Sequence, residues 1–143
     1  MKNKEPIEKF MTHSPHTINS GVPIETARQM MKKYGIRHLP VQVSGHLVGI
    51  VSERDLLLAR SLDPEGKLSV DDVMTAEPYS VTADTPLGAV VDEMTTHLYG
   101  SAVICNEKGK VVGIFTAIDG LREISDRLNT KDRKAAIAKG SFV

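Results

Sequence analysis

The sequence predicts a mixed α+β fold in which two copies of one supersecondary unit are related by a pseudo-twofold axis. The segment 45–55 returns as 109–119, a shift of 64 positions, with the same order of glycine, apolar residues and aspartate. In both copies, short strand-like segments alternate with segments whose apolar residues have helical spacing. Half of this 143-residue chain would bury only about 60% of its surface, so we expect the copies to share one compact molecule with equivalent clefts between them.

The first half of each copy is predicted to contain an amphipathic helical turn, a short extended segment and a helix. Pro23 and Pro86 are predicted to open the helices, because proline suits a first helical turn. Upstream residues repeat with a shift of 63 positions, as in Met11 and Met74. The paired segments are 6–11 and 70–74 for the turn, and 17–18 and 80–81 for the strand.

The second half of each copy is predicted to contain a hairpin and a last helix. Gly35 and Gly100 are expected to cap the preceding helices at their C-terminal ends. The hairpin strands are 39–43 with 47–51 and 101–105 with 111–115, each pair joined by a turn that contains glycine. Ser52 and Thr116 are natural N-caps for the helices that follow.

The predicted organisation is a first repeat over 5–60, a linker over 61–67 and a second repeat over 68–126, which together form one module. Past this point, 127–143 is polar and rich in lysine, and we expect a helical extension that frays at its end.

Composition favours an ordinary soluble globular protein. The 18 basic and 18 acidic residues cancel, which argues against nucleic acid or an anionic membrane surface as a partner. We expect neither a secretory leader nor a transmembrane span, because no long apolar run is present. The single Cys105 cannot form an internal disulfide, which favours a reducing, cytoplasmic location.

A motif at the start of each last helix is the strongest candidate for a binding site. Glycine lies in the strand, Ser or Thr follows, and Asp comes three residues later, at Ser52 and Asp55 and again at Thr116 and Asp119. A helix N-terminus favours anions, and a fixed carboxylate accepts hydrogen bonds from both hydroxyls of a diol such as ribose. The alternative is that these residues only cap helices, but the recurrence in register favours a ligand site.

The sequence resembles a tandem pair of CBS domains, the Bateman module, from about Pro6 to Ile124. The resemblance rests on Met-Thr-x-x-Pro at Met11 and Met74, Gly-Ile-Arg-His-Leu-Pro-Val at 35–41 and Val-Gly-Ile-Val-Ser-Glu-Arg-Asp at 48–55. It implies two β-α-β-β-α repeats packed through their sheets. It also implies an adenosyl ligand (AMP, ADP, ATP or S-adenosylmethionine) in up to two clefts.

The resemblance also implies roles for individual residues. Asp55 and Asp119 would hold the ribose, and Arg37 and His38 would meet phosphates. The second copy has Gly100 and Ser101 in place of this basic pair, so the cleft that combines Asp119 with Arg37 is favoured. The favoured cleft comprises Thr17, Ile18, Arg37, His38, Pro40, Ile114, Thr116 and Asp119. The second cleft comprises Ser80, Val81, Ser101, Ile50, Ser52 and Asp55.

We therefore expect a stand-alone regulatory module that requires no cofactor, catalyses no reaction and forms a homodimer that signals to a regulated protein. No metal site is expected, because the five histidines are scattered and accompany no cysteine cluster. One alternative is a dimerisation or protein-interaction module without a ligand. A nucleotide hydrolase would need a positioned base and a metal, and the sequence indicates neither.

Overall fold

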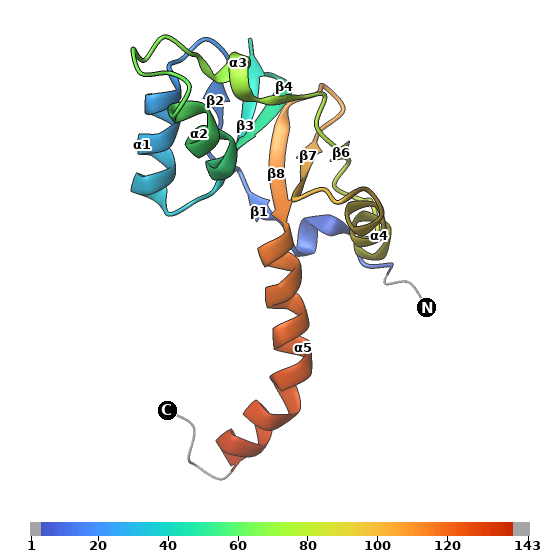
Figure 1. Cartoon of the computed structure of the whole chain (residues 1–143). Helices are drawn as coiled ribbons and strands as arrows, with labels where there is room; N and C mark the ends of the chain where they lie inside the picture. The colour runs from blue at the N-terminus through green and yellow to red at the C-terminus, as the bar shows by residue number, and fades with distance from the viewer. Residues whose placement is uncertain (1–3, 139–143) are drawn as a thin grey trace.

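The computed structural model describes residues 4–138 and confirms the predicted α+β fold of two repeats (Figure 1). The elements of the first half are η1 (Ile7–Lys9), β1 (Thr12–His13), β2 (Ile18–Asn19), α1 (Ile24–Tyr34), β3 (His38–Val43), β4 (His46–Ser52) and α2 (Glu53–Arg60). Those of the second half are α3 (Val70–Val73), β5 (Thr75–Ala76), β6 (Ser80–Val81), α4 (Leu87–His97), β7 (Ser101–Cys105), β8 (Val111–Thr116) and α5 (Ala117–Ala138).

In each four-stranded sheet, one of the two edge strands comes from the other half of the chain. The sheets have the orders β2-β3-β4-β5 and β1-β8-β7-β6. In the first, β2 runs parallel to β3, and β4 pairs antiparallel with β5, so Ile50 lies opposite Thr75. In the second, β1 pairs antiparallel with β8, so Thr12 lies opposite Ile114. The two repeats are therefore joined by exchanged edge strands.

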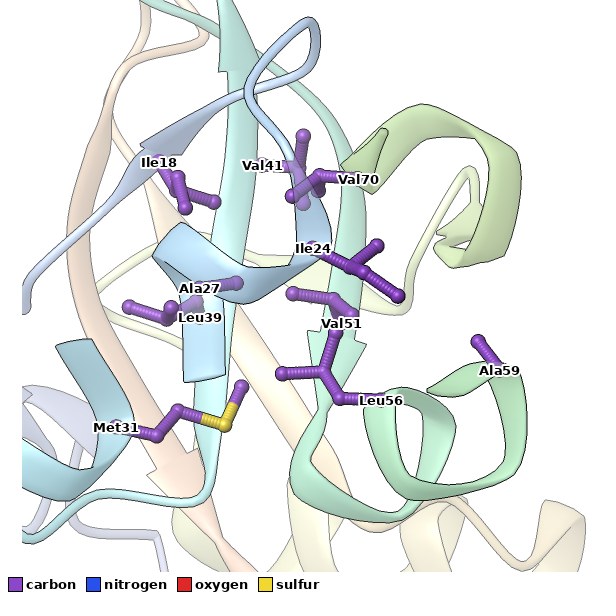
Figure 2. Close-up of a cluster of buried hydrophobic side chains, with 10 residues drawn as sticks. All are labelled: Ile18, Ile24, Ala27, Met31, Leu39, Val41, Val51, Leu56, Ala59 and Val70. Carbon is purple, nitrogen blue, oxygen red and sulfur yellow. The ribbon is translucent and has the colours of Figure 1, made fainter. Parts of the chain in front are cut away.

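Helices pack against one face of each sheet, and a separate apolar cluster fills the space between helices and sheet in each repeat. In the first cluster, α1, α2 and α3 cover one face of the sheet (Figure 2). Its members are Ile18, Ile24, Ala27, Met31, Leu39, Val41, Val51, Leu56, Ala59 and Val70. The second cluster comprises Ile7, Met11, Leu87, Val90, Met94, Ala102, Ile104 and Phe115. Ile7 and Met11 precede the first repeat's own sheet in the chain, yet they pack in the second repeat's core.

The opposite faces of the sheets lie toward each other. Side chains alternate along a strand, so Pro40 lies on the face opposite Leu39 and Val41. Pro40 is nevertheless fully buried, as is Val103. The hairpin ends of the two repeats also meet, because Leu47 N donates a hydrogen bond to Gly109 O at 3.5 Å.

Helix ends differ from the predictions at three positions. Pro23 and Pro86 are N-cap residues with extended backbone and not the first helical residues. Gly35 caps α1 in the left-handed conformation, as predicted, with φ of 65°. The predicted cap Gly100 is wrong: Leu98 caps α4, with φ of 59°, because it occupies the position that matches Gly35 under the 63-residue shift.

The helical extension is confirmed as far as Ala138, where α5 ends. The predicted fraying beyond that residue lies outside the described residues. Among the helices of the described chain, none has the length and apolar character needed to cross a membrane.

Candidate functional site

The first strand-to-helix junction holds the Asp55 carboxylate in place. Strand β4 ends at Ser52 and α2 begins at the next residue. Asp55 N donates to Ser52 Oγ at 3.1 Å, and Ser52 N donates to Asp55 Oδ2 at 2.9 Å. This reciprocal capping occupies one carboxylate oxygen. Within residues 4–138, nothing donates a hydrogen bond to Asp55 Oδ1.

The second junction repeats this arrangement between β8 and α5. Thr116 N donates to Asp119 Oδ2 at 2.9 Å, and Asp119 N donates to Thr116 Oγ1 at 3.3 Å. The Asp119 side chain is only 17% exposed, and its Oδ1 lies 3.7 Å from Nη1 of the exposed Arg122. The two junctions are therefore equivalent in geometry and differ in the surroundings of the second carboxylate oxygen.

Arg37 and Gly100 occupy equivalent places beside the two junctions. Arg37 O accepts a hydrogen bond from Glu53 N at 2.9 Å, and Gly100 O accepts one from Ala117 N at 3.1 Å. Each hydrogen bond satisfies the backbone N–H of the first residue of a helix. The exposed Arg37 side chain has no counterpart on Gly100.

His38 lies between the two junctions. Its backbone pairs with Ser52 across β3 and β4, while its Nε2 would lie 3.6 Å from a Cβ placed on Gly100. Burial lowers the pKa of His38, and the negative charges of Asp55 and Asp119 oppose this effect. The structure thus brings His38 near both carboxylates, whereas the sequence prediction grouped it with Asp119 alone.

Four other predicted residues lie on the strands that lead to the two junctions. Pro40 pairs with Ile50, and Ser101 pairs with Thr116, on the strands that lead to the junctions. Ile114 is 7% exposed and belongs to neither helix-covered cluster. A ligand at the junctions would therefore meet apolar strand residues beneath it and the hydroxyl groups of Ser101 and Thr116 beside it.

Four predicted residues come from the short first strands. Ile18 is buried in the first cluster, so it offers a ligand its main chain and not its side chain (Figure 2). Val81 likewise packs against the second cluster. Thr17 directly precedes β2 and is half-buried, and Ser80 is exposed at the start of β6.

Two surface hollows lie outside both predicted clefts. One, of about 260 Å³, lies between α1 and α2 and is lined by Arg28, Lys32 and Leu57 among others. The other, of about 680 Å³, lies beside the β7–β8 turn and includes Cys105. Burial raises the pKa of the Cys105 thiol, which disfavours the nucleophilic thiolate. In the part of the chain that the structure describes, no three His, Cys, Asp or Glu side chains form a group that could hold a metal ion.

The fold and the paired junctions define a tandem pair of βαββα-type repeats with exchanged edge strands. The family model described as CBS domain matches the chain twice, over residues 7–62 and 70–126. The chain therefore belongs to the CBS domain family, and it contains a tandem pair of these domains.

Similar proteins include enzymes and separate CBS pairs. An inosine-5'-monophosphate dehydrogenase from Korarchaeum cryptofilum is 29% identical over 136 residues, which are 95% of this chain and 28% of that enzyme. The chain spans less than a third of the length of this and other curated relatives that it matches.

This chain aligns with nearly the whole length of two solved structures. A Vibrio cholerae protein named for acetoin utilization (AcuB) has a TM-score of 0.81 and 28% identity, covering 90% of this chain and 98% of that one. The CBS domain pair of MJ0100 was solved with 5'-methylthioadenosine and S-adenosyl-L-methionine. It has a TM-score of 0.77 and 26% identity, covering 83% of this chain and 98% of that one.

Proposed function

We propose that this chain is a regulatory CBS pair that binds an adenosyl compound between its repeats and converts occupancy into a change of shape or assembly. The observation that carries the proposal is the pair of equivalent junctions, in which a capped helix start presents the Asp55 or Asp119 carboxylate. The module senses a ligand and catalyses no reaction of its own.

The chemistry of each junction fits the ribose of such a ligand. Capping occupies Oδ2 of each aspartate and leaves Oδ1 to accept hydrogen bonds from a sugar diol. Ile50 and Ile114, on the strands that lead to the junctions, would supply apolar contacts to adenine. The ligands solved with the MJ0100 pair both contain adenosine, which supports the same ligand class here.

Arg37 and His38 would distinguish the two clefts. A phosphate is stabilised by a nearby guanidinium, and the ring of His38 lies close to Gly100, whose carbonyl accepts a hydrogen bond from the first residue of α5. AMP, ADP or ATP would therefore prefer the Asp119 cleft. The Asp55 cleft would suit an adenosyl group without phosphate, such as S-adenosylmethionine.

A second candidate is an interaction module that needs no ligand. Exposed apolar side chains on α2, including Leu57 and Leu58, favour contact with another protein. A homodimer and a regulated partner protein are compatible with both candidates, so ligand binding is the property that distinguishes them.

Thermal unfolding with millimolar AMP, ATP or S-adenosylmethionine tests the proposal. A ligand at 100 times its dissociation constant stabilises by about 2.7 kcal/mol, which would raise the melting temperature by roughly 8 °C. The double variant Asp55→Asn with Asp119→Asn should lose this shift. Asp72→Asn is the matched control, because Asp72 makes the same capping contact with Ser69 at the short helix α3. No shift with any adenosyl compound would favour the ligand-free module.

A further inference from the structure

A positive charge lies beside the Asp119 carboxylate, on the same side of helix α5. Arg122 Nη1 is 3.7 Å from Asp119 Oδ1, the carboxylate oxygen that the helix cap does not use. The two residues are three positions apart in α5, so their side chains are neighbours on the helix surface. The guanidinium therefore belongs to the surroundings of the oxygen that we assign to the ribose.

The contact between Arg122 and Asp119 is a loose ion pair. A separation of 3.7 Å is too long for a hydrogen bond, so the attraction is between charges. The Arg122 side chain is 69% exposed, and water weakens the attraction in such pairs. The guanidinium is therefore able to move aside when hydroxyl groups bind Oδ1, while its charge stays close to the carboxylate.

The first junction has no such cation at the equivalent position. Under the 64-residue shift Arg122 matches Leu58, which likewise follows its junction aspartate, Asp55, by three residues. Leu58 is 63% exposed, so the two helices present an apolar and a basic side chain at the same place. Within residues 4–138, no arginine or lysine side chain forms an ion pair with Asp55. The junctions share their capping geometry and differ by one charge.

This difference in charge affects which ligands each junction accepts. An aspartate that accepts hydrogen bonds from a ribose keeps its negative charge, which repels phosphates on the same ligand and attracts a cationic group. Arg122 offsets the charge of Asp119, whereas Leu58 cannot offset that of Asp55. Phosphates are therefore repelled less at the second junction than at the first.

We propose that Arg122 is a specificity-determining residue of the Asp119 cleft, where it favours negatively charged adenosyl ligands over neutral and cationic ones. The role of Arg122 is to offset charge, so it requires no contact with a phosphate. The inference rests on the proposed function, because it concerns the ligand of the same cleft. Arg37 and Arg122 lie on different elements, before β3 and within α5, so substitutions separate their contributions.

Arg122→Leu tests the inference, because it gives α5 the residue of the first repeat. Affinities are measured by isothermal titration calorimetry in an Asp55→Asn background, which weakens the other cleft. The ATP affinity should fall about tenfold, and the affinity for the cation S-adenosylmethionine should rise about two- to threefold. The adenosine affinity should change less than about twofold. A purely structural role would move all three affinities in the same direction.

Two control variants separate the charge of Arg122 from its packing. Arg122→Lys retains the charge and should keep each affinity within about twofold of the parent. Arg127→Leu removes a charge from the same helix at a guanidinium that pairs with Glu123, and it should leave the ligand preference unchanged. In about 0.5 M salt the ATP loss of Arg122→Leu should shrink, because salt screens exposed charges. Circular dichroism of each variant verifies folding.

The outcomes distinguish this inference from the proposed function. If no adenosyl compound binds the wild-type chain, the proposed function fails and the inference fails with it. If ATP binding is lost in Asp119→Asn but unchanged in Arg122→Leu, the inference alone is overturned. Equal losses of ATP, adenosine and S-adenosylmethionine in Arg122→Leu would also overturn it, because they would show a structural role.

Discussion

The imidazole of His38 lies against Gly100, the residue that stands in the second repeat where Arg37 stands in the first. A Cβ on Gly100 would be 3.6 Å from Nε2, an ordinary contact distance. The pseudo-twofold symmetry is therefore broken at the point where the two junctions approach each other. The His38 ring lies near both carboxylates, and only the first repeat has an arginine at this position, which gives the proposed clefts different charges.

Asp119→Asn should weaken AMP binding more than Asp55→Asn does. Asparagine retains an acceptor for the capping bond but removes the charge that strengthens hydrogen bonds from a ribose. We expect a loss of roughly 10- to 100-fold at Asp119 and a smaller one at Asp55, measured by isothermal titration calorimetry. A larger loss for Asp55→Asn would assign the nucleotide to the other cleft.

Arg37→Ala should discriminate between phosphorylated and unphosphorylated ligands. The guanidinium has no role in binding adenosine itself, so AMP affinity should fall about tenfold while adenosine affinity changes less than about twofold. Arg60→Ala, at the far end of α2, controls for the loss of one positive charge. Equal losses for AMP and adenosine would remove the phosphate role of Arg37.

Acidification should destabilise the unliganded protein through His38. Burial lowers its pKa from the usual 6.5, so the unfolded chain binds this proton more readily than the folded one. The free energy of unfolding should therefore fall as the pH drops below about 6.5 toward the folded pKa, with no such loss above that range. Melting temperatures between pH 5 and 8 should show a shallower decline for His38→Gln than for wild type. His46→Gln, at an exposed histidine, should follow the wild-type profile.

Leu98→Gly should stabilise the protein. Leu98 caps α4 with φ of 59° and is 91% exposed, so glycine relieves backbone strain and removes little packing. We expect a gain of about 1 kcal/mol in urea unfolding. The reciprocal change Gly35→Leu should cost a similar amount, because Gly35 has the same conformation at the end of α1. A destabilised Leu98→Gly protein would contradict this account.

Gly49→Ala should destabilise the exchanged strand β5. Gly49 lies opposite Ala76, and an added Cβ would be 2.9 Å from Thr75 O and would also clash with the Met74 side chain. Such overpacking typically costs about 1–3 kcal/mol, measurable as a lower urea midpoint. Gly21→Ala is the control, because nothing lies within 4 Å of its added Cβ.

The repeat predicted the fold and the junctions well, because both depend on local patterns. Ser52 and Thr116 cap their helices as expected from strand, hydroxyl and carboxylate spacing. The structure also shows that His38 lies close to Gly100, a residue far from it in the sequence. The assignment of residues to the two clefts stays a prediction.

The exchange of edge strands was not predictable. Strands β1 and β5 have two residues each, too few for an alternating pattern to indicate a partner. The repeat reveals which segments are equivalent but not whether each pairs within its own copy. The repeated methionines at positions 11 and 74 are the sequence feature that accompanies the exchange. In the structure each packs beside a glycine of the other repeat's sheet, Met11 beside Gly113 and Met74 beside Gly49.

The exchanged strands β1 and β5 also determine how the chain would respond to cleavage. A protease cut near Pro64 would divide the polypeptide into two fragments, yet each fragment would still complete the other's sheet. Neither fragment alone has all four strands of either sheet. The fragments should consequently remain associated after nicking and should reconstitute the native molecule only when they are refolded together.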